Sequence, residues 1–223
     1  MNILLYSSIF WAFSVTYILL ETKSMTGSIQ TSILKAIPAF SAVFFVLLSF
    51  SPPVLFHVLL MAALVFCGLG DIAMEYDIVP GLGLFFISHI LFTADFIVHS
   101  LASATSIHLI LFSVVMILLL VYVYVYQRYL QRAEKPTELL PAVCVYAIII
   151  SLTVGSSILL WLSTGVLLGF LPFLGACFFV FSDSLIGIRE FHHRFKFDEP
   201  LTMVTYYLAI FLLSLGGMVY IFQ

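Results

Sequence analysis

Residues 107–127 read IHLILFSVVMILLLVYVYVYQ and contain no Asp, Glu, Lys or Arg. A helix needs about 20 mostly apolar residues to cross the hydrocarbon core of a bilayer. The charged run RYLQRAEKPTE follows at once, at 128–138. This stretch therefore predicts a transmembrane helix that ends at a membrane surface.

The whole chain has a composition close to that of this segment. Its 223 residues are 63% hydrophobic and 9% charged, whereas a soluble domain is about 25% charged. The mean hydropathy is +1.22. The predicted spans are 3–20, 31–49, 54–73, 82–99, 107–127, 138–160, 166–187 and 201–222. We therefore expect an all-α fold, a polytopic bundle of eight transmembrane helices that forms a single integral membrane domain over residues 1–223.

Two parts of this assignment have alternatives. Small and polar residues interrupt 138–187, and an interpretation with seven spans would merge or lose one helix there: Gly155, Ser163, Thr164, Gly165 and Gly169. No Lys or Arg precedes residues 3–20, and no small-residue cleavage site follows them. We therefore expect a retained first span rather than a signal peptide.

All eight Lys and Arg lie at odd-numbered connections between the spans. They are Lys23 and Lys35 at the first, Arg128, Arg132 and Lys135 at the fifth, and Arg189, Arg194 and Lys196 at the seventh. Basic residues beside membrane spans favour the cytoplasmic side. Both termini are thus predicted to be non-cytoplasmic, which requires an even number of spans.

Charge and cysteine content exclude other classes of protein. A net charge of -3 does not indicate a nucleic-acid partner. The three cysteines lie in apolar segments without metal-ligand spacing, which is typical of small buried hydrophobic residues. They are Cys67, Cys144 and Cys177. We expect neither a disulfide framework nor a cofactor.

Polar side chains inside the predicted spans gather near one membrane face. An ionisable residue in the hydrocarbon region is energetically costly, and it is a functional candidate for that reason. With a rise of about 1.5 Å per residue, these side chains fall in one layer on the predicted cytoplasmic side. They are Glu21, Lys35, Asp71, His89, Asp183, Tyr206 and Tyr207. We expect them to line a polar cavity that opens to the cytoplasm.

Most of these residues also have a purely structural interpretation. The two aspartates can pair with Lys35 or with loop arginines as helix clamps, and His89 can bond a backbone carbonyl in the core. Lys35 can extend to the lipid headgroups, and tyrosines are common near span ends. Glu75 and Asp77 fall in the short third connection, where we expect them to be solvated.

Two histidine-containing groups are weaker candidates. Asp95 and His99 lie one helical turn apart near the opposite face, and we expect them to form a structural pair. His192 and His193 are adjacent, so on a helix they point about 100° apart, a poor geometry for chelation. A metal site built from His89 and the two cavity aspartates stays an alternative, although zinc usually takes three or four close ligands.

Short motifs along the chain resemble the lysoplasmalogenase (YhhN-like) family of membrane enzymes. The motifs are Leu34-Lys35, Gly70-Asp71, FFISH at 85–89, the stretch 175–181 leading into Ser182-Asp183, and Tyr207-Leu208-Ala209. No single motif is specific, but their order and spacing are. The resemblance extends from about residue 30 to the end of the chain.

The resemblance implies hydrolysis of the vinyl ether bond of lysoplasmalogens to a fatty aldehyde and a glycerophospho-headgroup product. This reaction needs an acid that protonates the enol carbon and an anion beside the resulting oxocarbenium-like cation, as in glycosidases. Asp71 and Asp183 are the predicted pair, and His89 would orient water or a carboxylate.

The remaining residues of the layer are predicted to bind the substrate. Lys35 would contact the phosphate and Tyr207 a substrate oxygen, and Tyr206, Glu21 and Ser182 would complete the site. The expected partners are a lysophospholipid substrate and membrane lipids. The oligomeric state is left open.

Other functions fit parts of the same pattern. A transporter of protons, cations or lipids would use the buried acids as a relay, although such sites usually lie near the bilayer midplane. An inactive lipid-binding relative would explain why Ile210 stands where the family often has a polar residue. A zinc-dependent membrane amidase would need more histidines within the spans.

Overall fold

The computed structural model describes residues 2–23, 25, 27–50, 52–133 and 138–221. In these residues the regular secondary structure is entirely helical. The helices are α1 (Ile3–Thr22), α2 (Ile29–Ser49), α3 (Leu55–Met74), α4 (Ile78–Leu101), α5 (Ser106–Leu130), α6 (Leu140–Thr164), η1 (Leu167–Gly169), α7 (Phe170–Phe191), α8 (Asp198–Ser214) and η2 (Leu215–Ile221). The eight α-helices, with η1 extending α7 and η2 extending α8, are each long and apolar enough to cross a membrane, which confirms the predicted fold class.

The predicted spans coincide with these helices. The largest differences are four residues, as where α4 begins at Ile78 rather than at 82 and α6 ends at Thr164 rather than at 160. The alternative with seven spans is wrong. Gly165 follows α6 with a φ of 65°, in the left-handed region that commonly ends a helix at glycine. The chain then turns through η1 into α7.

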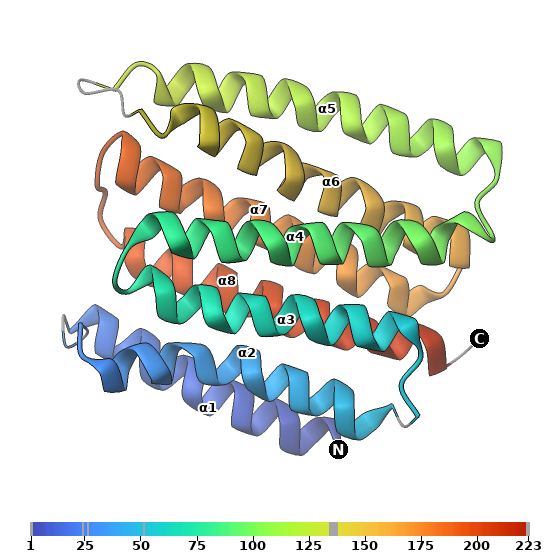
Figure 1. Ribbon diagram of the computed structural model, residues 1–223, viewed down its shortest axis with the longest axis horizontal. Coiled ribbons are helices and arrows are strands. Elements are labelled where there is room, and N and C mark those ends of the chain that lie inside the picture. Colours follow the sequence, from blue (N-terminus) through green and yellow to red (C-terminus); the bar gives the residue numbers. More distant parts are fainter. Residues whose placement is uncertain (1, 24, 26, 51, 134–137, 222–223) are drawn as a thin grey trace.

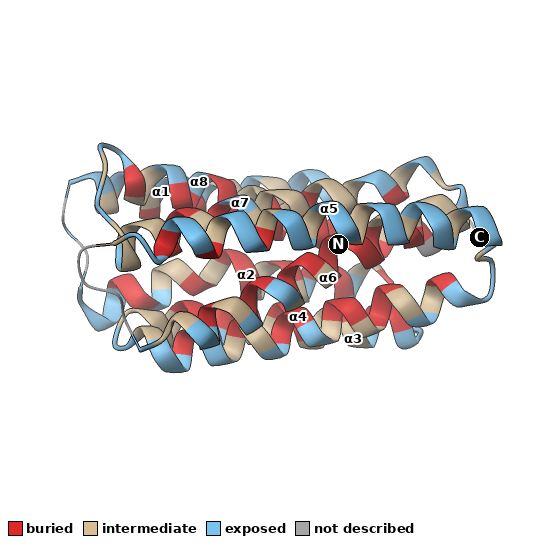
Figure 2. Cartoon of the chain, turned by 90° about the horizontal axis from the view of Figure 1, so that it is seen from above, coloured by how far each residue is buried: buried red, intermediate tan, exposed pale blue. Residues whose placement is uncertain are grey.

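The helices form two layers, which Figure 2 shows from above. One layer contains α1, α8, α7 and α5, and the other contains α2, α3, α4 and α6. The layers are joined at one edge where α1 packs on α2 and at the other where α6 packs on α5 and α7. Neighbours in space are therefore often distant in sequence, as Figure 1 shows for α3 and α8.

Aromatic side chains fill much of the space between the layers. Tyr6 stacks on Phe45 with ring centroids 4.2 Å apart, and its ring also lies 5.5 Å from Phe211. The Tyr6 hydroxyl is 2.6 Å from Ser214 Oγ, so the buried polar atom is satisfied. α5 lies at the edge and buries only three residues, all toward its C-terminus: Val123, Gln127 and Leu130.

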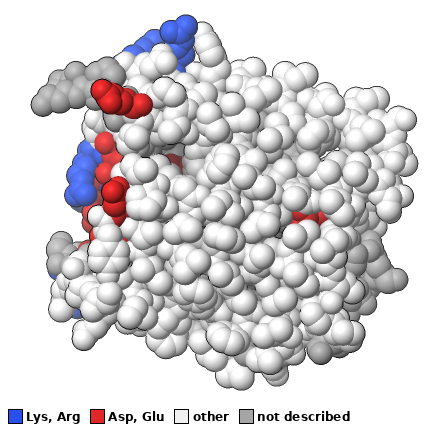
Figure 3. All heavy atoms as spheres, in the orientation of Figure 1, with Lys and Arg blue, Asp and Glu red and all other residues white. Residues whose placement is uncertain are grey.

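The Lys and Arg side chains that Figure 3 shows, and most of the Asp and Glu, gather at one end of the bundle. This end holds the C-terminal ends of α1, α3, α5 and α7 and the beginnings of the helices that follow them. The described lysines and arginines lie there, as the sequence predicts, and Lys135 lies outside the described residues. We call this end of the bundle the charged end; its cytoplasmic orientation stays a prediction.

Candidate functional site

A polar cavity of about 180 Å³ opens at the charged end, between helices of both layers. Five of the predicted site residues line it: Glu21, Lys35, Asp71, Asp183 and Tyr206. They come from α1, α2, α3, α7 and α8, and the structure thus brings together residues as far apart as 21 and 206. We call this space the acid cavity.

Asp71 reaches the acid cavity from the last turn of α3 and is 1% exposed. Beside it, Gly70 lets α4 approach closely, since a Cβ there would lie 2.9 Å from the ring of Phe85. The Tyr206 hydroxyl donates to Asp71 Oδ2 over 2.7 Å. Asp71 on α3 and Tyr206 on α8 belong to different layers, so the hydrogen bond that holds this carboxyl group joins the two layers.

Asp183 reaches the same cavity from α7. The Tyr146 hydroxyl of α6 donates a hydrogen bond to Asp183 Oδ2. The two aspartates thus share one arrangement, in which a tyrosine from another helix holds a carboxyl group at the cavity wall. Tyr146 is not among the site residues that the sequence predicted. It lies in the second turn of an otherwise apolar span, at a depth similar to that of Tyr206. This depth is the feature of the sequence that could have identified it as a site residue.

Lys35 forms an ion pair that the sequence analysis did not foresee. Its Nζ atom lies 2.8 Å from Glu75 Oε1, and the two side chains are 12% and 14% exposed. The Tyr17 hydroxyl donates to the same oxygen over 2.9 Å. The expectation of a solvated Glu75 is therefore wrong, because the end of α3 turns this side chain inward, whereas Asp77 is exposed and caps α4.

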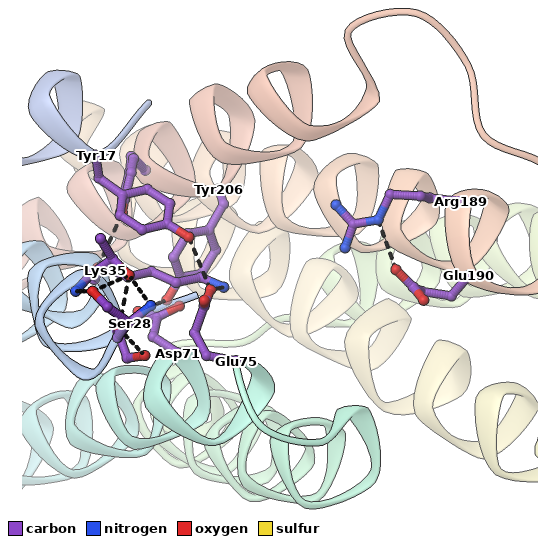
Figure 4. Close-up of polar contacts among 11 residues, drawn as sticks. Tyr17, Ser28, Lys35, Asp71, Glu75, Arg189, Glu190 and Tyr206 are labelled. Atoms are coloured by element: carbon purple, nitrogen blue, oxygen red, sulfur yellow. Dashed lines mark hydrogen bonds and ion pairs between the residues drawn. The ribbon is translucent and has the colours of Figure 1, made fainter. Parts of the chain in front are cut away.

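Figure 4 shows the two groups together: Tyr17, Lys35, Asp71, Glu75 and Tyr206 point toward one another from four helices. The Lys35 Nζ atom also lies 5.9 Å from the centre of the Tyr17 ring. The Tyr17 ring and the Glu75 carboxylate therefore hold the ammonium group in place at the cavity wall.

The mouth of the acid cavity carries both signs of charge. Arg194 Nη2 lies 3.2 Å from Glu199 Oε1, with 70% and 30% of the side chains exposed. Arg189 pairs with Glu190 over 2.8 Å, away from the cluster around Lys35 (Figure 4). Deeper in, Glu21 Oε2 is buried and has no hydrogen-bond partner among the described residues. A zwitterionic group would find partners for both of its charges here.

The other three predicted residues lie behind the cavity wall. His89 is fully buried, with Nδ1 3.1 Å from Thr153 Oγ1, and its Nε2 has no hydrogen-bond partner in the described part of the chain. Ser182 donates to the Thr202 carbonyl over 3.0 Å and ties α7 to α8. Their predicted roles, in catalysis for His89 and in substrate binding for Ser182, stay predictions.

Tyr207 lies next to Tyr206 but points elsewhere. It is fully buried, and its hydroxyl donates to the Lys35 carbonyl over 3.1 Å. It thereby fixes the backbone of α2 beneath the Lys35 ammonium group. Its predicted contact with a substrate oxygen stays a prediction.

The expected pair near the opposite face is confirmed. His99 Nδ1 lies 3.0 Å from Asp95 Oδ1 and 2.8 Å from the Asp95 carbonyl oxygen. His192 and His193 contact each other at the charged end, with their Nδ1 atoms 2.7 Å apart. Across the described ranges, no three His, Cys, Asp or Glu side chains lie close enough to hold a metal ion.

Asp183 borders a second, apolar space. This pocket has a volume of about 40 Å³ and is lined mainly by α5, α6 and α7. Phe85 and Asp183 belong to the walls of both the pocket and the acid cavity. The Asp183 carboxyl group therefore stands at the boundary between polar and apolar surroundings.

Neither the curated proteins nor the solved structures gave a match. The comparison with protein families matched residues 30–217, which include all the predicted site residues except Glu21. The match covers most of the 223 residues, and the chain belongs to the YhhN family.

Proposed function

We propose that this protein is a membrane hydrolase that cleaves the vinyl ether bond of lysoplasmalogens. One observation carries the proposal. Two carboxyl groups, each bonded by a tyrosine hydroxyl, line one cavity at the end of a membrane bundle, and one of them also borders an apolar pocket. A vinyl ether lies at the same kind of boundary, between a polar headgroup and an apolar chain.

The reaction assigns a different task to each carboxyl group. Asp183 borders the apolar pocket, on the chain side, and in our proposal it protonates the second carbon of the alkenyl chain. The double-bond electrons form the new C–H bond, and the positive charge is shared by the first carbon and the ether oxygen. The Asp71 carboxylate stabilises this cation, as the anionic partner does in glycosidases.

Water then completes the cleavage. It adds to the first carbon and gives a proton to Asp71, which forms a hemiacetal. The hemiacetal hydroxyl returns a proton to Asp183, the carbon–oxygen bond to glycerol breaks, and the glycerol oxygen takes the proton from Asp71. The products are a fatty aldehyde and a glycerophospho-headgroup, and both aspartates regain their starting protonation states.

The charges around the acid cavity support a zwitterionic phospholipid headgroup. Lys35 and Arg194 offer cations to a phosphate, and Glu21 and Glu199 offer carboxylates to an amine. Charge-assisted hydrogen bonds of this kind are stronger than neutral ones. His89, behind Tyr146 with ring centroids 5.8 Å apart, is proposed to keep that tyrosine in place beside Asp183.

The test is aldehyde release by the protein purified in detergent. The substrates are a lysoplasmalogen, an acyl lysophospholipid and a ceramide. Each is measured with and without a chelator, to test whether the reaction needs a bound metal. Only the lysoplasmalogen is expected to react. Asp71→Asn and Asp183→Asn should each lower kcat by at least about a hundredfold, as expected for loss of a general acid or base.

The matched control is Asp95→Asn, which changes a fully buried aspartate near the opposite face. It should keep its activity toward the lysoplasmalogen. Full activity in both cavity variants would exclude the carboxyl-pair mechanism, and no aldehyde from any substrate would exclude the function.

A further inference from the structure

Two apolar spaces lead in series from Asp183 to the outer surface of the bundle. The pocket of about 40 Å³ shares Met74, Phe85, Asp183 and Ile186 with the acid cavity. Beyond it, a groove of about 350 Å³ runs between the first turns of α4 and α6. The groove and the pocket share Leu82, Val143 and Tyr146. We call the two spaces together the apolar passage.

The groove exists because α4 and α6 separate toward the charged end, as Figure 1 shows. Deeper in the bundle the two helices are held together at Thr153. Its Oγ1 atom lies 3.1 Å from His89 Nδ1 and 3.0 Å from Thr93 Oγ1. The groove is lined by residues nearer the charged end than this clamp, such as Gly83 on α4 and Ala142 on α6.

The groove is open and faces the outside of the bundle. Val79 and Val145 on its two sides are 51% and 55% exposed, and in a membrane such surfaces contact lipid chains. A Cβ atom added at Gly83 would have no neighbour within 4 Å. The lining of the groove contains no charged residue, so a hydrocarbon chain can lie in it without displacing an ion pair.

We propose that the apolar passage holds the single hydrocarbon chain of the substrate, which enters from the lipid between α4 and α6. This inference rests on the proposed function. The reacting double bond is at the head of the chain, so a chain lying outward through the groove places that bond at Asp183. The headgroup then occupies the acid cavity.

The other way into the site is less favourable for a chain. It leads through the mouth of the acid cavity, past Arg194 and Glu199. An apolar chain drawn along that route would desolvate charged side chains, which is costly. Tyr146 stands where the groove meets the pocket, and its hydroxyl bonds Asp183. Tyr146 is thus a positioning residue at the inner end of the passage.

Gly83→Trp tests the passage, because it places a large side chain in the groove. The matched control is Val98→Trp, on the same helix, at a lipid-facing position that is 50% exposed and lies away from the groove. In Gly83→Trp the substrate chain should lose the groove contacts of about two methylene groups. This loss should lower kcat/KM for a hexadecenyl lysoplasmalogen about tenfold. A butenyl analogue, too short to reach the groove, should react as it does with the unmodified protein.

Unchanged kcat/KM of Gly83→Trp for the hexadecenyl substrate would overturn the proposal. An equal loss with both substrates would also overturn it, since the damage would then not depend on the chain. The thermal midpoint of each variant in detergent identifies unfolded protein, and Gly83→Leu replaces the tryptophan variant if that one fails to fold.

A binding measurement separates this inference from the proposed function. A lysophospholipid with a diazirine in mid-chain is photo-crosslinked to the protein, and the labelled peptides are identified by mass spectrometry. Label on the first turns of α4 and α6 that is lost in Gly83→Trp and kept in Val98→Trp supports the passage. Label elsewhere overturns it, even if the protein releases no aldehyde.

Discussion

At the scale of single residues, the site depends on tyrosine hydroxyls that hold carboxyl groups. Tyr206 bonds Asp71 and Tyr146 bonds Asp183, in each case from a different helix. A hydrogen bond to a charged group is worth about 1.5–3 kcal/mol; in the proposed reaction Asp71 is charged from the start, and Asp183 becomes charged as it gives up its proton. A carboxyl group that loses this bond can rotate away from the reacting carbon, and the loss should therefore affect the chemical step.

We expect Tyr206→Phe and Tyr146→Phe to lower kcat about 10- to 100-fold, which corresponds to that hydrogen-bond energy. KM should change little, because the proposed mechanism uses both hydroxyls to hold the aspartates and not, as the sequence analysis expected for Tyr206, to bind the substrate. Initial rates of aldehyde release give the two constants. Tyr6→Phe is the control, since it removes another buried hydroxyl, bonded to Ser214 in the core, and should reduce stability alone. A loss that falls on KM would show that the tyrosines bind substrate instead.

The sequence predicted part of this site, and the missing part has a physical cause. Hydropathy and a fixed rise per residue place a side chain at a depth, so Asp71, Asp183 and Lys35 were assigned to one layer. Depth does not show which way a helix face turns. Glu75 was expected in solvent because it falls in the short third connection, yet its side chain turns inward and pairs with Lys35. Tyr146 was missed among apolar residues because its partner Asp183 comes from another helix.

At the scale of the helices, the sequence predicted where each begins and ends but not which ones pack together. Lipid-facing and core-facing surfaces are both apolar, so the hydrophobic pattern that orients a helix in a soluble protein is weak here. Close packing depends instead on small residues. At Gly175 on α7, a Cβ would lie 3.0 Å from the Ala209 carbonyl oxygen and from the Leu213 backbone nitrogen of α8.

The same substitution at two glycines should therefore have different effects on stability. Gly175→Leu forces α7 and α8 apart, and overpacking of this kind costs about 1–3 kcal/mol. Gly83→Leu meets open space and removes a flexible glycine from a helix, which gains about 0.5–1 kcal/mol. Thermal midpoints in detergent should fall for the first variant and rise or stay level for the second. Equal midpoints would show that the α7–α8 crossing adapts to a side chain.

At the scale of the whole molecule, the charge asymmetry predicts how the bundle is oriented in the membrane and, with it, to which side the acid cavity opens. The described lysines and arginines lie at the end where the acid cavity opens. Since basic residues favour the cytoplasmic side, the headgroup product of the proposed reaction would be released into the cytoplasm. The apolar passage opens near the same end and would receive substrate from the cytoplasmic leaflet.

Cysteine labelling in intact cells tests this orientation. Ser103 lies exposed between α4 and α5, and Tyr76, 65% exposed, lies between α3 and α4 at the charged end. Replacing Ser103 or Tyr76 with cysteine changes no lysine or arginine, so the charge asymmetry is preserved. Ser103→Cys should react with a membrane-impermeant maleimide from outside, and Tyr76→Cys only after permeabilisation. The unmodified protein measures the background from its own cysteines. The reverse pattern would place the acid cavity on the non-cytoplasmic side, and substrate would then come from the other leaflet.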